Sequence, residues 1–310
     1  MKAWPLSELL ERFAAGDWQA LSRAITIVEN DSYGKETVMR MAFQCTKKDC
    51  LVLGLTGAGG AGKSTLISRI IADYRSRSLK VGVLAIDPSS SLTGGAFLGD
   101  RLRMGQYNSD VGVFIRSFAS RGALGGLSQG AKDALYLYKA FGFHLIIIET
   151  LGVGQEETDI SNFSDVTAVV LAPGNGDHIQ MAKAGTQEIA DIFVVNKADK
   201  TEAEGLFLQL QSVLEILPDE SRPLLVRTTA SDGGDIGMLL QAIACASERN
   251  SGKRAEKNRT RIEHEIRSRA LQHLDSELRI WSEQLTDEVL TGKMTPYEAG
   301  LCLSKMLHIP

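Results

Sequence analysis

The stretch from Gly57 to Ser64 reads Gly-Ala-Gly-Gly-Ala-Gly-Lys-Ser, and it constrains the fold more than any other part of the chain. It matches the pattern G-x-x-x-x-G-K-[S/T], in which backbone amides of a glycine-rich turn surround phosphate oxygens. Such a turn works between a strand and the start of a helix, where unpaired N–H groups point at the anion. The apolar run Leu51–Thr56 precedes it, and an amphipathic segment, residues 65–74, follows it. The motif therefore predicts a strand, a phosphate loop and a helix that bind a nucleotide.

The side chains and amides of this loop have separate expected roles. We expect Lys63 to place its charge on the β- and γ-phosphates and the Ser64 hydroxyl to bind Mg²⁺. The other expected nucleotide contacts in the loop are Gly57, Gly59, Gly60, Ala61, Gly62 and Thr65. The loop thus supplies candidate residues for a nucleoside triphosphate and its magnesium ion.

The composition limits the kinds of partner. The chain has 310 residues, of which 44% are hydrophobic and 23% charged, with a net charge of −4. This acidic, interspersed balance gives no electrostatic support for binding nucleic acid or an anionic membrane. No run of about 18 apolar residues is present, and the first residues lead into an amphipathic helix rather than a secretory signal. The four cysteines and five histidines are dispersed, so we expect a cytoplasmic protein without a transition-metal site.

Between Leu51 and about Ser247, short β-branched runs alternate with helical patterns. Most of the runs are continuously apolar, which is typical of strands covered on both faces of a mostly parallel sheet. We therefore predict a doubly wound α/β domain over residues 49–250, with its ligand at the carboxyl ends of the strands. Besides residues 51–56, the expected strands are residues 80–86, 113–117, 144–149, 166–171, 192–196 and 223–227.

Helical segments are expected on both sides of this domain. Residues 1–48 show helical periodicity and predict an N-terminal arm. Residues 249–258 are polar and predict a flexible junction. A long helix is then expected over about residues 261–291, and a capping pattern predicts a last helix over residues 295–307. Because a helical pair this small cannot bury a core alone, the segment 251–310 is expected to pack on the domain or, preferably, on another subunit.

A second nucleotide motif, Asn196-Lys-Ala-Asp199, follows the expected strand at residues 192–196. An Asp carboxylate here accepts hydrogen bonds from N1–H and the exocyclic amine of guanine, a pair of donors that adenine lacks. Together with the phosphate loop, the motif favours GTP over ATP. After the next strand, a backbone amide of the Thr229-Ala230-Ser231 loop could contact the guanine O6. The residues expected to recognise the base are Asn196, Lys197, Asp199, Thr229, Ala230 and Ser231.

Two acidic residues end expected strands where a metal ion would lie. Asp87 follows residues 80–86, and Glu149 opens the sequence Glu-Thr-Leu-Gly, in the place of a D-x-x-G motif. There the carboxylate holds Mg²⁺ directly or through water, although each carboxylate could instead cap a helix or form a turn. Gln155 follows this motif and could orient a water molecule.

Four longer strings of sequence point to one family. They are residues 84–90, 93–104, 149–155 and 194–199. Over about residues 50–240 the chain resembles the MeaB/ArgK-type GTPases, which are chaperones of adenosylcobalamin-dependent acyl-CoA mutases such as methylmalonyl-CoA mutase. The resemblance places the chain in the GTPase class that includes signal-recognition and metallochaperone GTPases.

The resemblance implies a mechanism and partners. GTP binding and hydrolysis on a homodimer would gate cofactor delivery to a mutase and help to protect or repair it. Carried over by position, Asp87, Asp100 and Glu149 form the acidic set that holds Mg²⁺ and positions water, with Lys63 on the phosphates. The water is positioned by Asp100, by Gln155 or by a residue that arrives with the partner. Residues 174–185 fall where the family has a segment that couples nucleotide state to the partner.

Some residues depart from the family pattern. The phosphate loop reads Ala58-Gly59-Gly60 where many members have a Pro before the glycine. Three residues of the coupling segment, Met181, Ala182 and Ala184, also differ from those usually found. No D-x-H-x-x-G cobalamin-binding signature occurs, so the mutase is expected to be a separate chain. Two alternatives stay open at this point. A nickel-type metal-insertion GTPase would want segments rich in His and Cys, and a P-loop small-molecule kinase would need no guanine motif.

Overall fold

The computed structural model describes residues 4–46, 50–87, 107, 110–119, 127–150, 158–174, 189–233, 235–252 and 254–306. The chain divides into two compact units, Met1–Gly252 and Lys253–Pro310. The first unit contains the predicted sheet and the N-terminal helices, and the second unit contains two helices.

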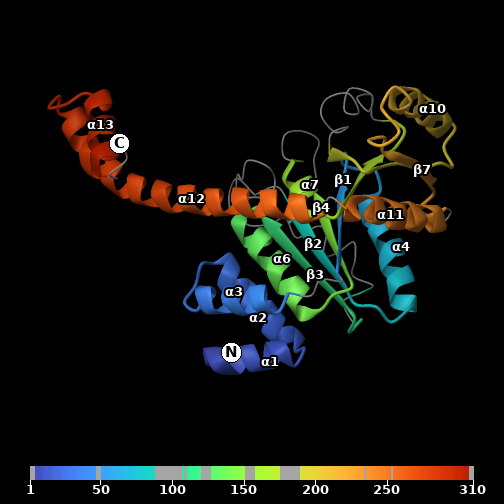
Figure 1. Ribbon diagram of the computed structural model, residues 1–310, viewed down its shortest axis with the longest axis horizontal. Helices are drawn as coiled ribbons and strands as arrows, with labels where there is room; N and C mark the ends of the chain where they lie inside the picture. The colour runs from blue at the N-terminus through green and yellow to red at the C-terminus, as the bar shows by residue number, and fades with distance from the viewer. Residues whose placement is uncertain are drawn as a thin grey trace. The chain divides into compact units, whose positions relative to one another are not determined.

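A parallel sheet of seven strands forms the centre of the first unit among the described residues, in the order β3-β2-β4-β1-β5-β6-β7 (Figure 1). Every pairing between neighbouring strands is parallel. The strands are β1 (Leu51–Thr56), β2 (Val81–Asp87), β3 (Val113–Ala119), β4 (Leu145–Thr150), β5 (Val166–Leu171), β6 (Ile192–Asn196) and β7 (Leu224–Thr228). All of the predicted strands are confirmed, with ends shifted by at most one or two residues.

Helices cover both faces of this sheet, which confirms the doubly wound α/β fold. Alternate residues of β5 belong to different apolar clusters, because successive side chains of a strand point to opposite faces. On one face lie α4 (Lys63–Ser76) and α11 (Ile236–Ser251). The other face is covered by α6 (Gln129–Phe141), α7 (Thr158–Phe163) and α10 (Glu202–Leu214).

Three N-terminal helices pack beside α6 (Figure 1): α1 (Leu6–Ala14), α2 (Trp18–Glu29) and α3 (Lys35–Gln44). The side chain of Asp17 begins α2 by accepting a hydrogen bond from the Gln19 N–H at 2.7 Å. The Trp18 ring then lies 4.9 Å from the ring of Phe141, between centroids, and contacts two further aromatic rings. The third helix, α3, was not predicted as a separate element.

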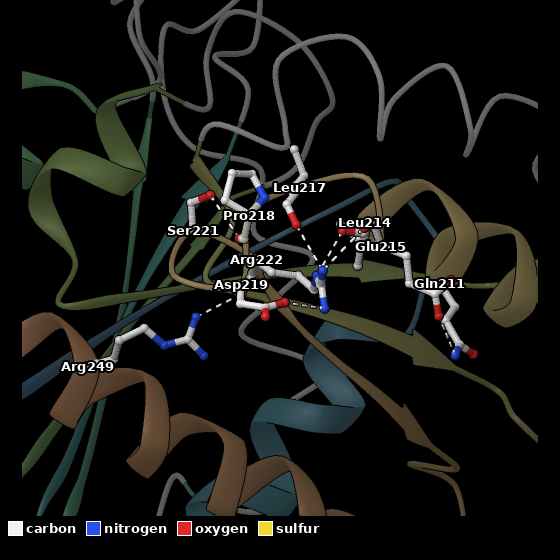
Figure 2. Close-up of polar contacts among 9 residues, drawn as sticks. All are labelled: Gln211, Leu214, Glu215, Leu217, Pro218, Asp219, Ser221, Arg222 and Arg249. Carbon is white, nitrogen blue, oxygen red and sulfur yellow. Dashed lines mark hydrogen bonds and ion pairs between the residues drawn. The ribbon is translucent and has the colours of Figure 1, made fainter.

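The connection from α10 to β7 is held by one arginine, as Figure 2 shows. Arg222 donates hydrogen bonds to carbonyl groups at the last residue of α10 and just after it. Its own carbonyl oxygen accepts a hydrogen bond from Arg249 of α11 at 2.8 Å. Its other partners are the carbonyl oxygens of Leu214, Glu215 and Leu217 and the carboxylate of Asp219. These contacts fix the chain just before β7, whose far end carries the loop at residues 229–231.

The second unit consists of α12 (Arg254–Leu290) and α13 (Pro296–Met306). The predicted capping pattern is confirmed: Glu298 accepts hydrogen bonds from the Thr295 N–H at 2.8 Å and from the Thr295 hydroxyl at 2.9 Å. These two bonds lower the pKa of the Glu298 carboxyl. The boundary between the two units lies at Gly252–Lys253, inside the junction predicted at residues 249–258. The chain on both sides of it is helical rather than irregular, because α11 continues to Ser251 and α12 begins at Arg254. Arg, Glu, Lys and Ala in this stretch favour helix, and Gly252 is its one strong helix breaker.

Among the described helices, none is long and apolar enough to cross a membrane.

Candidate nucleotide-binding site

The phosphate loop runs from the end of β1 to the start of α4, as its sequence predicts. Two of its glycines are required by both backbone angle and space. Gly57 has φ of 139°, and a Cβ placed there would lie 2.1 Å from the carbonyl oxygen of Val170 in β5. Gly62 has φ of 94°, and its Cβ would lie 2.3 Å from Nδ2 of Asn196. Glycine alone therefore lets the loop approach β5 and the guanine motif this closely.

Lys63 is the first residue of α4, and only 3% of its surface is exposed. Its Nζ donates hydrogen bonds to the carbonyl oxygens of Gly57, at 2.6 Å, and of Ala58, at 3.0 Å. The ammonium group is thus folded back over the loop whose amides are the candidate phosphate ligands. This places a positive charge at the helix start, where anions are already favoured.

Ser64 and two carboxylates form the candidate magnesium site. The Ser64 hydroxyl donates a hydrogen bond to Oε1 of Glu149 at 2.9 Å. Glu149 lies in β4 and Asp87 ends the neighbouring strand β2, and each is 1% exposed. Hydroxyl and carboxylate oxygens are the hard ligands that Mg²⁺ prefers, so these residues fit the ion. Asp100 and Gln155 lie outside the described residues, and the part of the chain that is described contains no group of three or more His, Cys, Asp or Glu side chains able to hold a metal ion.

Asn196 ends β6 and joins the two nucleotide motifs. It is 2% exposed, and its Nδ2 donates a hydrogen bond to the carbonyl oxygen of Ala61 at 2.8 Å. Its Oδ1 accepts hydrogen bonds from Thr228 Oγ1 at 3.0 Å and from the Ala230 N–H at 3.2 Å. One buried amide therefore holds the phosphate loop and the loop after β7 together.

Lys197 makes a second link to the phosphate loop. Its backbone has φ of 59°, and its Nζ donates a hydrogen bond to the carbonyl oxygen of Gly60 at 2.7 Å. In the turn that follows, the Ala198 N–H donates to the Thr228 carbonyl at 3.1 Å, and Asp199 is exposed. Because Asn196 and Lys197 direct polar atoms at the loops, Asp199 is the side chain of this motif that stays a candidate for contact with the base.

Two contacts near the site were not predicted from the sequence. Arg69 of α4 donates to the carbonyl oxygen of Ala230 at 2.9 Å and to that of Ser231. The Tyr107 hydroxyl donates to the carbonyl oxygen of Ser68 at 2.6 Å. No local pattern could have revealed the Arg69 contact, because its partners come from a loop far along the chain.

A cleft of about 820 Å³ opens at the start of α4. This volume suits a small organic ligand. Its lining includes Gly60, Lys63, Ser64, Arg69, Glu149 and Lys197. Several of the described candidates are not part of this lining: Gly57, Gly59, Ala61, Asp87, Asn196, Asp199, Thr229, Ala230 and Ser231. The cleft thus unites the phosphate loop, the Ser64–Glu149 pair and Lys197. Residues 175–185 of the predicted coupling segment lie outside the described residues.

Comparison with known proteins agrees with these motifs. Residues 21–282 match the family described as methylmalonyl Co-A mutase-associated GTPase MeaB. A putative GTPase of Pyrococcus horikoshii is 40% identical, over 98% of this chain and 99% of its own length. Fused isobutyryl-CoA mutase of Geobacillus kaustophilus is 36% identical over 66% of this chain, a match that covers 20% of that protein.

A solved structure supports the fold over the full length. The crystal structure of LAO/AO transport system kinase superposes with a TM-score of 0.69 and 25% identity, and the match covers 99% of each chain. The family match spans the phosphate loop, both acidic strand ends and the guanine motif. The chain therefore belongs to the MeaB family of methylmalonyl-CoA mutase-associated GTPases.

Proposed function

We propose that this protein binds and hydrolyses GTP with Mg²⁺ and, as a homodimer in the cytoplasm, gates the loading and protection of an adenosylcobalamin-dependent acyl-CoA mutase. The observation that carries the nucleotide part is the joining of the guanine motif to the phosphate loop through Asn196 and Lys197. A base loop tied to a phosphate loop holds both ends of one nucleotide at a fixed separation, which lowers the entropy cost of binding.

Each candidate residue would have a separate role in GTP hydrolysis. Lys63 stabilises the charge on the β- and γ-phosphates, and the loop amides hold the phosphate oxygens. Ser64, Asp87, Asp100 and Glu149 would hold Mg²⁺, which when bound neutralises charge that develops on the phosphates. Asp100, Gln155 or a residue of the partner orients the attacking water. Asp199 accepts the two guanine donors.

The proposal that the partner is an acyl-CoA mutase is supported by the names of relatives of this chain. In fused isobutyryl-CoA mutase, a segment similar to this chain is part of a protein named for its mutase. We propose that the client of this protein is a mutase on a separate chain. A water-positioning residue that arrives with the client would make hydrolysis report on docking.

The test measures GTP hydrolysis by the purified protein with Mg²⁺, alone and with the apo form of each candidate cobalamin-dependent acyl-CoA mutase. ATP serves as the control nucleotide. We expect slow hydrolysis of GTP that one mutase stimulates, by tenfold or more if the client completes the site. Hydrolysis of GTP that no mutase changes would contradict the chaperone role while leaving the nucleotide assignment in place. Equal hydrolysis of ATP and GTP would contradict the nucleotide assignment itself.

A further inference from the structure

Arg69 joins the helix that follows the phosphate loop to the loop that follows β7. Its Nε donates to the carbonyl oxygen of Ala230 at 2.9 Å, and its terminal nitrogen donates to the carbonyl oxygen of Ser231. A Cβ placed on Gly233 would lie 3.7 Å from the same guanidinium group, so the side chain lies directly against this loop. Arg69 also lines the nucleotide cleft.

These two bonds set the direction of a backbone amide. In a planar trans peptide the N–H points opposite to the carbonyl oxygen, and the described residues contain no cis peptide. Since the Ala230 oxygen is held by Arg69, the N–H of the same peptide, which belongs to Ser231, points away from the guanidinium group. The Ala230 N–H is already donated to Oδ1 of Asn196 at 3.2 Å. The Ser231 amide therefore points away from Arg69, while the N–H and the carbonyl oxygen of Ala230 are both held by side chains.

The position of this loop suits the base rather than the phosphates. β7 pairs with β6 so that Thr228 lies beside Asn196, and the Ala198 N–H donates to the Thr228 carbonyl oxygen at 3.1 Å. The turn that carries Asp199 therefore lies next to the start of the Thr229–Ser231 loop. If Asp199 takes N1–H and the exocyclic amine of guanine, the neighbouring O6 needs a donor from an adjacent element.

We propose that Arg69 is a positioning residue for guanine recognition, which holds two consecutive carbonyl groups so that the Ser231 amide donates to guanine O6. The proposal rests on the guanine-nucleotide binding proposed above. Arginine suits this role because its rigid, planar group offers several donors in fixed directions, whereas the lysine ammonium is a point charge on a flexible stem. The same residue also ties the base loop to α4, whose first residue is Lys63.

The test compares GDP with 6-thio-GDP, in which sulfur, a weak hydrogen-bond acceptor, replaces O6 while N1–H and the amine stay. Dissociation constants are measured for wild type, Arg69→Gln, Arg69→Lys and the control Arg77→Gln. Arg77 is an exposed arginine at the end of α4 that pairs with Asp73. We expect wild type to prefer GDP. Arg69→Gln should lose about tenfold in GDP affinity, as for one hydrogen bond, with little change for 6-thio-GDP.

Arg69→Lys should give an intermediate ratio, and Arg77→Gln should match wild type with both nucleotides. An equal loss for GDP and 6-thio-GDP in Arg69→Gln would overturn the proposal, because it would show general support of the loop. An unchanged GDP affinity would overturn it as well. If Arg69→Gln does not fold, as judged by its melting temperature, the ratio of Arg69→Lys decides in the same way. Failure of the wild type to distinguish GDP from ADP would instead count against the proposed function.

Discussion

The nucleotide site and the N-terminal helices are attached to one sheet by different kinds of contact. Around the site, side chains bond to main-chain oxygens, as in the contacts of Asn196 with Ala61 and of Lys197 with Gly60. The helices α1–α3 are attached mainly through apolar and aromatic side chains in the cluster that surrounds α6. The ion pair of Arg116 with Glu29, at 2.7 Å, adds to this packing.

This difference predicts how each region responds to change. A hydrogen bond has a narrow range of distance and angle, so the site depends on a few particular atoms. Apolar packing acts through the total area removed from water, so it depends on the size and shape of side chains more than on single atoms. A polar substitution in the site should therefore change binding with little effect on folding. A large-to-small change under the helices should do the reverse.

The largest expected effect on binding comes from Lys63→Ala. Loss of the charged hydrogen bonds that Lys63 is expected to make with the β- and γ-phosphates, at about 1.5–3 kcal/mol each, should weaken GTP binding roughly 100-fold or more. The melting temperature should stay near that of wild type, because the hydrogen bonds of Lys63 with Gly57 and Ala58 lie within the loop itself. Titration calorimetry with GTP measures the first effect and thermal unfolding the second.

Lys35→Ala is the matched control for that change. Lys35 belongs to α3 and pairs with the buried Asp133 at 3.2 Å, so its loss should lower stability and leave GTP affinity unchanged. Tight GTP binding by Lys63→Ala would show that the loop is not the phosphate site.

A smaller effect, on folding alone, is expected from Trp18→Ala. Loss of a partly buried ring that contacts three aromatic neighbours should lower the free energy of unfolding by about 2–4 kcal/mol. Denaturant unfolding measures it, with GDP affinity measured alongside and expected to be unchanged. Tyr33→Ala, at a side chain that is 96% exposed, is the control and should be nearly neutral. A parallel loss of GDP affinity in Trp18→Ala would mean that the helices support the site directly.

The same contrast explains which features could be predicted from the sequence. The strands were predictable because buried parallel strands are continuous apolar runs, and the phosphate loop because its glycines are required by contacts such as that of Gly57 with Val170. The α12 start at Arg254 was missed because a charged surface helix resembles a polar linker in sequence. The helix α3 was missed since it has few buried side chains to mark a face.

Contacts between segments far apart in the chain also could not be predicted from the sequence. In the sequence, Arg69 cannot be distinguished from any other arginine on a helix, and its contact with Ala230 exists only in the folded protein. Asn196 could be predicted as part of a motif, yet its links to Ala61 and Thr228 depend on the order of the strands. Sequence patterns report local requirements, whereas these contacts follow from the packing of the whole sheet.

Recognition of guanine by the turn after β6 can be tested with the single substitution Asp199→Asn. The measurement is the affinity of wild type and variant for GDP and for xanthosine diphosphate. We expect wild type to prefer GDP and the variant to prefer the xanthine nucleotide, because the amide offers a donor where guanine also donates. We expect the ratio of the two affinities to change by about 100-fold or more. An unchanged preference for GDP in the variant would show that Asp199 does not recognise guanine and would remove it from the base pocket.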